Sequence, residues 1–154
     1  MNKQSKKKAL IFGVSGQDGA YLARFLLARG YSVHGTSRDA EMSSFASLET
    51  LGIRSLVSLH SAALTDFRST LQVISRVQPD EIYNLSGQSS VGLSFQLPVE
   101  TLESVATATL NVLESIRFLG GDIRFYNAGS SECFGDTGNV AANESTPFHP
   151  KSPY

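Results

Sequence analysis

Short apolar runs alternate with longer stretches of helical periodicity along this chain. The runs that predict strands are Lys8–Phe12, Ser32–Thr36, Ser55–Leu59, Glu81–Leu85 and Ile123–Asn127. The stretches that predict helices are Asp18–Arg29, Asp66–Val77 and about Val99–Leu119. This alternation is typical of a parallel sheet with crossover helices rather than of a sandwich or a bundle. We therefore expect an α/β domain with a doubly wound parallel sheet.

Loops and one amphipathic helix add detail to this expectation. The polar segments Asp39–Ser47 and Asp136–Pro153 predict loops, and the second is long enough to suggest a functional role. Gly30 marks the end of the first predicted helix, which carries on one face the apolar side chains of Tyr21, Leu22, Phe25 and Leu26.

The composition is that of one ordinary globular domain. Its 154 residues are 41% hydrophobic and 18% charged, which allows a sizeable core. Thirteen Lys and Arg residues against fourteen Asp and Glu residues give a net charge of −1. No global field favours nucleic acid or a membrane surface as a partner, so an anionic ligand must be held locally.

The N-terminal residues and the single cysteine restrict the setting of the protein. Four lysines lie within residues 1–8, and the apolar run Ala9–Phe12 that follows is too short for a signal segment or a membrane span. We interpret residues 1–8 as a flexible basic arm. Cys133 alone cannot form an internal disulfide or a multi-cysteine metal site, which suits a reducing cytoplasm. We expect no metal site, because ligand spacing is also absent among His34, His60 and His149.

A glycine-rich segment lies between the first predicted strand and the first predicted helix. Its sequence, Gly13-Val14-Ser15-Gly16-Gln17-Asp18-Gly19, has the spacing Gly-x-x-Gly-x-x-Gly. Such glycines allow a tight turn, close approach of the backbone to a pyrophosphate and close helix packing, and the helix N-terminus then faces the phosphates. The alternative is a plain strand-to-helix turn. We expect a Rossmann-type dinucleotide site that includes Gly13, Ser15, Gly16, Gln17, Asp18 and Gly19.

The end of the second predicted strand bears on which dinucleotide binds. An acidic residue there would bind the ribose 2′-hydroxyl of NAD, whereas an arginine would accommodate the 2′-phosphate of NADP. The chain has Thr36-Ser37-Arg38-Asp39 at this point. Ser37 and Arg38 come first, and the planar guanidinium suits a phosphate, so we expect NADP. In the alternative, Arg38 is a solvated loop charge and Asp39 binds the ribose.

A polar stretch, Tyr126–Gly135, follows the last predicted strand and therefore lies at the carboxyl edge of the sheet, where open α/β folds bind ligands. Ser130 can hydrogen-bond a sugar hydroxyl that becomes a carbonyl, and Tyr154 can act as acid and base at that oxygen. Glu132 can take a carbon-bound proton. From the residues alone, a polar loop or a helix cap is the alternative for Ser130-Ser131-Glu132.

Several segments resemble the GDP-mannose 4,6-dehydratase family of extended short-chain dehydrogenases/reductases. They are Gly13–Leu22, Val77–Leu85, Arg117–Gly120, Ser130–Glu132 and Pro147–Tyr154, and the similarity spans nearly the whole chain from Ala9. The resemblance implies that residues 9–154 are an NADP-binding Rossmann domain. It also leads us to expect that the chain is truncated before a C-terminal substrate-binding region, since a helix is about to begin after Pro153.

The family has a catalytic Ser/Thr, Glu, Tyr and Lys, which the resemblance carries over to Ser130, Glu132 and Tyr154, with the lysine beyond the last residue. It implies further cofactor contacts from Leu64, Leu85, Ser86, Gln88 and Tyr154, although for Gln88 a simple strand-end loop is the alternative. It also implies GDP-mannose as the substrate and a homo-oligomer, a dimer or tetramer. In such an oligomer the segment Arg38–Glu49 would contact a neighbour's cofactor, unless it is a mobile surface loop.

The family reaction converts GDP-mannose to GDP-4-keto-6-deoxymannose. C4 of the sugar is oxidised by NADP⁺, the residue at Glu132 removes the acidified C5 proton, water leaves from C6, and hydride returns to C6. Related 4-epimerases lack a glutamate at this position, and dTDP-glucose dehydratases have Asp-Glu in place of Ser131-Glu132. Another nucleotide-sugar dehydratase or epimerase of the family, or a non-catalytic NADP-binding sensor or subunit, stays open as an alternative.

The chain departs from the family pattern in two places. Ala62-Ala63 stand where relatives commonly have Gly-Asp, whose aspartate contacts adenine, so the adenine contact is open. On the last predicted helix, Val105 and Ala108 stand where related enzymes often have Asp and Gly, which indicates a diverged branch or altered packing.

Overall fold

A five-stranded parallel sheet forms the centre of the computed structural model, which describes residues 6–154. The strand order is β3-β2-β1-β4-β5, and every pairing between neighbours is parallel. The α/β class and the Rossmann-type sheet expected from the sequence are confirmed. The strands are β1 (Lys8–Phe12), β2 (Ser32–Ser37), β3 (Ser58–Ser61), β4 (Glu81–Asn84) and β5 (Arg124–Asn127).

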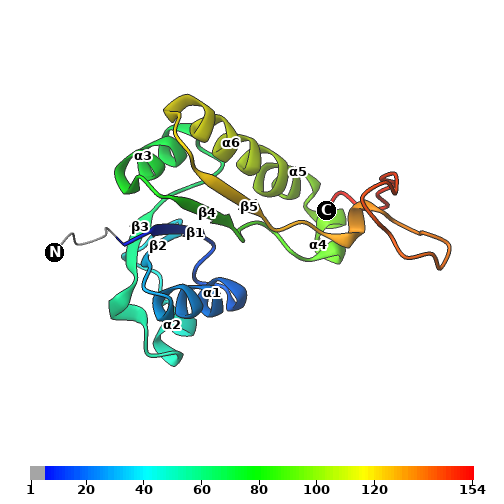
Figure 1. Cartoon of the computed structure of the whole chain (residues 1–154). Helices are drawn as coiled ribbons and strands as arrows, with labels where there is room; N and C mark the ends of the chain where they lie inside the picture. Colours follow the sequence, from blue (N-terminus) through cyan, green and yellow to red (C-terminus); the bar gives the residue numbers. More distant parts are fainter. Residues whose placement is uncertain (1–5) are drawn as a thin grey trace.

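Helices cover both faces of the sheet (Figure 1). α1 and α2 lie on one face, and α3 and α6 lie on the other. α5 continues into α6 through one π-helical turn, so the helix predicted over Val99–Leu119 is continuous. The helices are α1 (Gln17–Ala28), α2 (Ala46–Thr50), α3 (Phe67–Val77), α4 (Val91–Gln96), α5 (Pro98–Leu102), the π turn Glu103–Thr107 and α6 (Ala108–Leu119), with 3-10 turns at Arg54–Leu56 and Ser131–Cys133.

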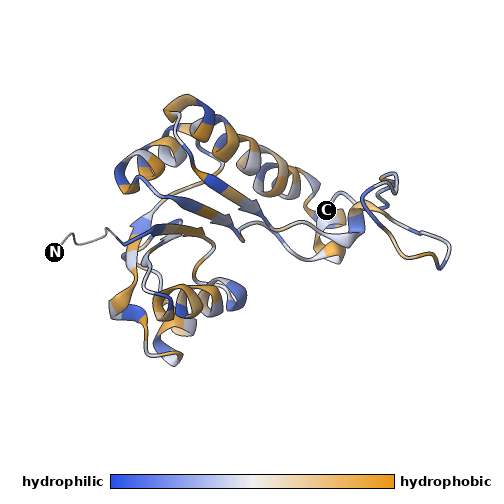
Figure 2. Cartoon of the chain, in the orientation of Figure 1, coloured by the Kyte–Doolittle hydropathy of each residue, from blue (hydrophilic) through white to orange (hydrophobic). Residues whose placement is uncertain are grey.

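The central strand β1 is buried on both faces. Ala9 and Ile11 pack with the side chains of α1 and α2, whereas Leu10 and Phe12 pack with those of α3 and α6. Successive side chains of a strand point to opposite faces, so a strand between two helical layers needs apolar residues at every position. Figure 2 shows this apolar strand between the two layers of helices.

The helix α1 faces the sheet with small residues rather than with aromatic ones. Its buried positions are Gly19, Ala20, Ala23 and Leu26. Tyr21 and Phe25 belong to the predicted apolar face but are 49% and 50% exposed, so this face is only partly buried. The Arg29 guanidinium carbon lies 3.3 Å from the centre of the Phe25 ring. Only small side chains let the helix backbone approach the glycine-rich segment closely.

Three features differ from the sequence prediction by more than one residue. β3 begins at Ser58 rather than Ser55, because the residues before it form a 3-10 turn and pairing with β2 starts only at His34↔Ser58. α2 begins inside the segment predicted as a loop, Asp39–Ser47, and α4 was not predicted. Both helices have only five or six residues, which is too short for a helical period to stand out.

Glu81, at the start of β4, ties the amino edge of the sheet together. Its carboxylate accepts hydrogen bonds from the hydroxyls of Tyr31 (3.2 Å) and Tyr83 (2.8 Å), and lies 3.5 Å from Lys7 Nζ. Burial acts to raise the pKa of Glu81, but the hydrogen bonds from Tyr83 and Tyr31 and the charge of Lys7 outweigh it and lower this pKa. Burial and the bond to Glu81 raise the pKa of Tyr83 to about 12.

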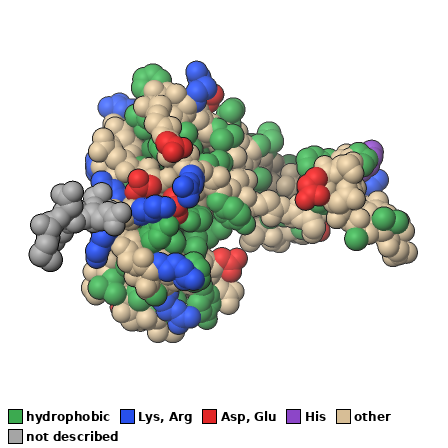
Figure 3. Space-filling view, in the orientation of Figure 1, with side chains coloured by type: hydrophobic (Ala, Val, Ile, Leu, Met, Phe, Trp, Pro, Cys, Tyr) green, Lys and Arg blue, Asp and Glu red, His purple; other side chains and the backbone are tan. Residues whose placement is uncertain are grey.

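The predicted basic arm meets the fold at this cluster. Lys7 contacts Glu81, and Lys8 is the first residue of β1. Residues 1–5 of the arm lie outside the described residues. Acidic and basic side chains are interspersed over the face shown in Figure 3, without a broad area of one sign.

A pair of histidines joins β2 to the edge strand β3. His34 Nδ1 lies 3.0 Å from His60 Nε2, and the two rings are stacked with their centres 5.3 Å apart. Burial, then the neighbouring His60 and Lys8, lower the pKa of His34. Burial and Arg76 lower the pKa of His60. The folded protein therefore favours the neutral form of both rings.

This pair predicts a loss of stability in mild acid. Both pKa values lie below their ordinary value of 6.5, so the unfolded chain binds more protons than the folded chain as the pH falls below 6.5. The stability that the pair contributes is complete above pH 6.5 and is lost as the pH falls through the folded pKa values. Urea unfolding between pH 7.5 and 5 should show the decrease, and His60→Gln should make it smaller. His149→Gln, at an exposed position, is the control; a wild-type slope in His60→Gln would contradict the prediction.

Candidate functional site

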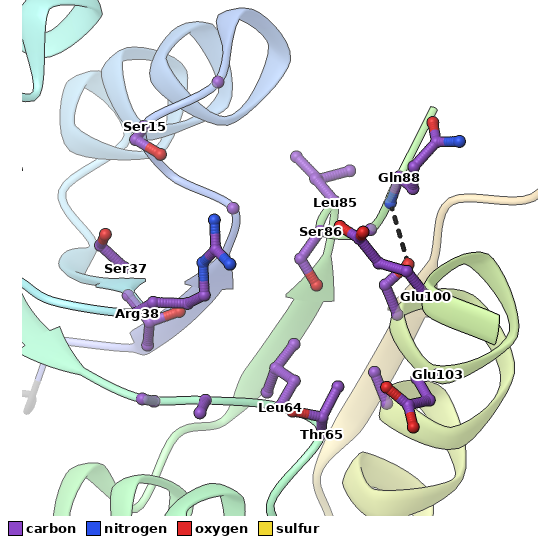
Figure 4. Close-up of a pocket in the computed structure, with 18 of the residues that line it drawn as sticks. Ser15, Ser37, Arg38, Leu64, Thr65, Leu85, Ser86, Gln88, Glu100 and Glu103 are labelled. Atoms are coloured by element: carbon purple, nitrogen blue, oxygen red, sulfur yellow. Dashed lines mark hydrogen bonds between the residues drawn. The ribbon is translucent and has the colours of Figure 1, made fainter. Parts of the chain in front are cut away.

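A cleft of about 920 Å³ opens at the carboxyl edge of the sheet (Figure 4). The loops that follow β1, β2, β3 and β4 form most of its wall, and residues of α5, the π turn and α6 complete it. Of the residues expected to bind a cofactor, those in its lining are Gly13, Ser15, Gly16, Ser37, Arg38, Leu64, Leu85, Ser86 and Gln88.

The glycine-rich segment turns the chain from β1 into α1. Gly13 has φ +82°, and a Cβ on it would lie 2.7 Å from the carbonyl oxygen of Leu85. A Cβ on Gly19 would overlap the backbone of Gly13 and Val14. Gly16 caps α1 without a side-chain hydrogen bond, so the N–H groups of the first turn stay available for an anion.

The remaining residues of this segment lie outside the lining. Gln17 and Asp18 are exposed on the first turn of α1, and Gly19 is buried beneath the turn. Gly19 therefore does not face the cleft. Because it has no side chain, α1 can pack closely against the backbone of Gly13 and Val14.

The loop after β2 presents Arg38 to the cleft and turns Asp39 away from it. Asp39 Oδ1 accepts hydrogen bonds from the backbone N–H groups of Glu41 (2.9 Å) and Met42 (3.1 Å). This turn brings Ser43 back to the cleft, where its hydroxyl lies 2.6 Å from that of Ser37. Asp39 is absent from the lining among the described residues.

The loop after β3 is held by two hydrogen bonds to the carbonyl oxygen of Leu64. Asn111 Nδ2 of α6 donates at 2.8 Å and Thr70 Oγ1 of α3 at 3.4 Å. Asp66 caps α3 through the N–H of Ser69. The loop consequently lines the cleft with Ala62, Ala63, Leu64 and Thr65.

The loop after β4 is anchored by the buried side chain of Asn84. Asn84 Oδ1 accepts from the Ser86 hydroxyl (2.6 Å), and its Nδ2 donates to Asn127 Oδ1 at the end of β5 (2.7 Å). The amide of Gln88 is bonded to both backbone groups of Ser90, and its backbone N–H donates to Ser104 Oγ at 3.2 Å. Gln88 thus lines the cleft while its side chain shapes the strand-end loop.

The acidic side of the cleft was missed by sequence reasoning. Glu100 and Glu103 line it from α5 and the π turn, together with Ser104 and Ala108. The only signal in the sequence is two glutamates three residues apart, which places them on one helix face. Such a spacing is common on solvated faces, so it does not indicate a cleft.

The expected catalytic residues lie beyond the cleft lining. Ser130 Oγ accepts from the N–H of Glu132 at 3.2 Å and so caps the 3-10 turn, which leaves the hydroxyl proton free to be donated. Ser130, Glu132 and Tyr154 are each partly buried, and the cleft lining includes none of them. The cap that the sequence offered as an alternative is thus formed, by Ser130.

The chain after β5 extends beyond the carboxyl end of the sheet and folds back on itself (Figure 1). His149 N–H donates to the carbonyl oxygen of Cys133 at 3.0 Å. The rings of Phe134 and Phe148 meet edge to face with centres 5.2 Å apart. These contacts bring Phe148 and His149 next to the segment that carries Ser130 and Glu132.

The described residues lack the features of two other kinds of site. Within residues 6–154, no three His, Cys, Asp or Glu side chains are grouped so that they could hold a metal ion. No helix in this part of the chain has the length and apolar character needed to cross a membrane.

The sheet and its covering helices define a Rossmann-type domain, and solved structures share this fold. A UDP-Glc/GlcNAc 4-epimerase from Campylobacter jejuni superposes with a TM-score of 0.84 at 22% identity, over 96% of this chain and 44% of the epimerase. A UDP-glucose 4-epimerase from Thermus thermophilus, described in complex with NAD, superposes with a TM-score of 0.78 at 26% identity, over 96% of this chain and 46% of that enzyme.

Sequence comparison is more specific. The family model for GDP-mannose 4,6 dehydratase matches residues 10–154, and the chain belongs to this family. GDP-mannose 4,6-dehydratase from Vibrio cholerae is 46% identical over 158 residues, which are 97% of this chain and 42% of the relative. GDP-mannose 4,6 dehydratase 2 from Arabidopsis thaliana is 43% identical, over 98% of this chain and 43% of the relative. The chain thus spans about two fifths of the length of these relatives.

The packing of α1 predicts a large effect of one added methyl group. Gly19→Ala would place Cβ against backbone atoms of Gly13 and Val14, which cannot rotate away. The free energy of unfolding should therefore fall by about 1–3 kcal/mol. Gly92→Ala in α4 is the matched control, because no atom lies within 4 Å of its added Cβ. Chemical denaturation measures both variants, and equal stabilities would contradict the close approach.

Proposed function

We propose that this chain is the NADP-binding part of an enzyme that dehydrates GDP-mannose. The observation that carries the proposal is the cleft at the carboxyl edge of the sheet, with the glycine-rich turn on one side and Arg38 on the other. The relatives of the chain are named as GDP-mannose 4,6-dehydratases, and a structural neighbour is described in complex with NAD.

The residues present fit a dinucleotide. Gly13 and Gly16 line the cleft without a side chain that would keep a pyrophosphate from the backbone, and the uncapped first turn of α1 offers N–H donors to it. Ser15, Gly16 and Ser86 would contact the phosphates and the ribose next to the nicotinamide. Leu64 and Leu85 offer apolar walls for the two rings.

The loop after β2 favours NADP over NAD. A carboxylate at this strand end would repel a 2′-phosphate, but both N–H bonds to Asp39 Oδ1 hold that carboxylate in its own turn. Arg38 is the one cation among the residues that line the cleft in the described part of the chain. Its guanidinium can form charge-assisted hydrogen bonds with a 2′-phosphate.

In the proposed reaction the chain's own residues move protons around the sugar. Bound NADP⁺ would accept and later return the hydride. Ser130, whose hydroxyl proton is free, would donate to the oxygen at C4, and Tyr154 would exchange a proton with the same oxygen. Glu132 would take the proton from C5 and so promote loss of water from C6. The contacts of Phe148 and His149 with Phe134 and Cys133 join the segment before Tyr154 to the one that carries Ser130 and Glu132, which supports a shared site for these three groups.

A second candidate is a non-catalytic NADP-binding sensor or subunit. It is favoured by one observation: the cleft lining contains none of Ser130, Glu132 and Tyr154, and Ser130 serves as a cap. Another nucleotide-sugar dehydratase of the same family would differ from the first proposal in its nucleotide sugar, and an epimerase would differ in its reaction as well. We propose a cytoplasmic homo-oligomer in each case, consistent with the exposed apolar side chains of Val99, Leu102, Leu110 and Leu113 on α5 and α6.

The cofactor proposal predicts a selective effect of Arg38→Ala. Loss of a charge-assisted pair with the 2′-phosphate should weaken NADP binding about 10- to 100-fold and leave NAD binding nearly unchanged. Isothermal titration calorimetry with both dinucleotides measures this. Arg68→Ala, an exposed arginine of α3 outside the cleft, is the control. Equal losses for NADP and NAD would show that Arg38 only shapes the loop.

The reaction proposal predicts that Glu132→Gln separates oxidation from elimination. The assay needs the parts of the relatives that this chain does not span, so the substitution is made in a full-length protein that carries residues 1–154. The amide keeps the volume of the side chain but removes the base, so turnover should fall about 10²–10⁴-fold while C4 oxidation, seen as NADPH absorbance, survives. Solvent deuterium uptake at C5 is the second measurement.

The competing interpretation gives a different result. If Glu132 only supports the turn, its replacement should slow every step equally and modestly, as the loss of a cap worth about 1 kcal/mol would. C5 exchange at the wild-type rate would exclude Glu132 as the base.

A further inference from the structure

The cleft carries negative side chains that phosphate binding does not explain. Arg38 lies on one wall, and Glu100 and Glu103 lie on the opposite wall (Figure 4). Neither glutamate takes part in an ion pair among residues 6–154. A carboxylate in the wall of an anion-binding cleft is unfavourable unless it faces a hydrogen-bond donor of the ligand.

The position of Arg38 indicates where the adenine of a dinucleotide would lie. If Arg38 binds the 2′-phosphate and the Gly13 turn binds the pyrophosphate, the adenosine lies at the β2 and β3 side of the cleft. The base then reaches the loop after β3, which lines the cleft with residues 62–65. This step rests on the proposed NADP binding.

That loop is poor in free acceptors. Ala62 and Ala63 have no polar side-chain atoms, and the carbonyl oxygen of Ala63 accepts the N–H of Asp66 at 3.0 Å. The carbonyl oxygen of Leu64 already accepts from Asn111 at 2.8 Å. The hydroxyl of Thr65 is the one side-chain acceptor that residues 62–65 offer to an exocyclic amine, so a charged acceptor has to come from another element.

Glu103 is the acidic side chain that faces this loop. In Figure 4 it points towards Leu64 and Thr65, whereas Glu100 reaches towards Ser86 on the other side of the cleft. We infer that the Glu103 carboxylate accepts a hydrogen bond from the 6-amino group of adenine and makes the cleft selective for an adenine base. A carboxylate acceptor gives a stronger hydrogen bond than the neutral hydroxyl of Thr65.

The test compares NADP with nicotinamide hypoxanthine dinucleotide phosphate, in which the 6-amino group is replaced by an oxygen. The wild-type chain should bind the hypoxanthine form at least about tenfold more weakly, because that oxygen and the carboxylate are both acceptors. In Glu103→Gln the ratio of the two affinities should fall close to one, because the amide can donate as well as accept. Calorimetric titration gives each dissociation constant.

Two further variants separate the outcomes. Glu114→Gln, the same change on the exposed side of α6 and outside the cleft, should keep the wild-type ratio. A ratio near one in the wild type with NADP still bound, or a ratio that falls in Glu100→Gln and not in Glu103→Gln, overturns the inference while leaving NADP binding intact. If neither dinucleotide binds, the proposed function fails and this inference with it.

Discussion

The close contact between three pieces of backbone at the end of β1 is the constraint on which the rest of the structure depends. Gly13 turns the chain out of the central strand with φ +82°, and the carbonyl oxygen of Leu85 lies where a side chain would begin. Gly19, the third residue of α1, packs against the backbone of Gly13 and Val14. Because no Cβ separates these segments, the N-terminus of α1 lies next to the carboxyl end of the sheet and the first turn of the helix opens onto the cleft. The small buried residues of α1 and the outward aromatic side chains follow from the same closeness.

Side-chain amides hold the other walls of the cleft in place. Asn84 is 3% exposed, and its amide joins Ser86 to Asn127, so the loops after β4 and β5 share one anchor. Asn111 does the same for the loop after β3 through the carbonyl oxygen of Leu64. A buried amide that lost its partners would cost about 1–3 kcal/mol, so these bonds specify one arrangement of the loops. The hydrogen bonds of Asn84 therefore link the cleft wall at Ser86 to the end of β5, from which the segment that carries Ser130 continues.

Family membership and local geometry answer different questions about this protein. The match over residues 10–154 identifies the class of reaction in which the relatives take part. Charge placement then bears on the ligand within that class: Arg38 faces the cleft, Asp39 is bonded within its own turn, and Glu103 stands opposite. Arg38 and Asp39 belong to the loop after β2, whereas Glu103 belongs to the π turn, so their relation to Glu103 depends on the strand order.

The sequence by itself determined the elements with a strong local signal. The continuous apolar run of β1, the spacing of the glycines and the helix predicted over Asp66–Val77 each reflect contacts within a few residues, and the structure has all three, with α3 at Phe67–Val77. It did not determine α2 or α4, the start of β3, or the outward direction of Tyr21 and Phe25, because these depend on pairing and packing partners far along the chain. Tertiary structure alone decided that Glu100 and Glu103 line the cleft, that Asp39 does not, and that His34 meets His60. A charge spacing or a lone histidine carries no record of which distant loop it will face, since that is set by the order of parallel strands in the sheet.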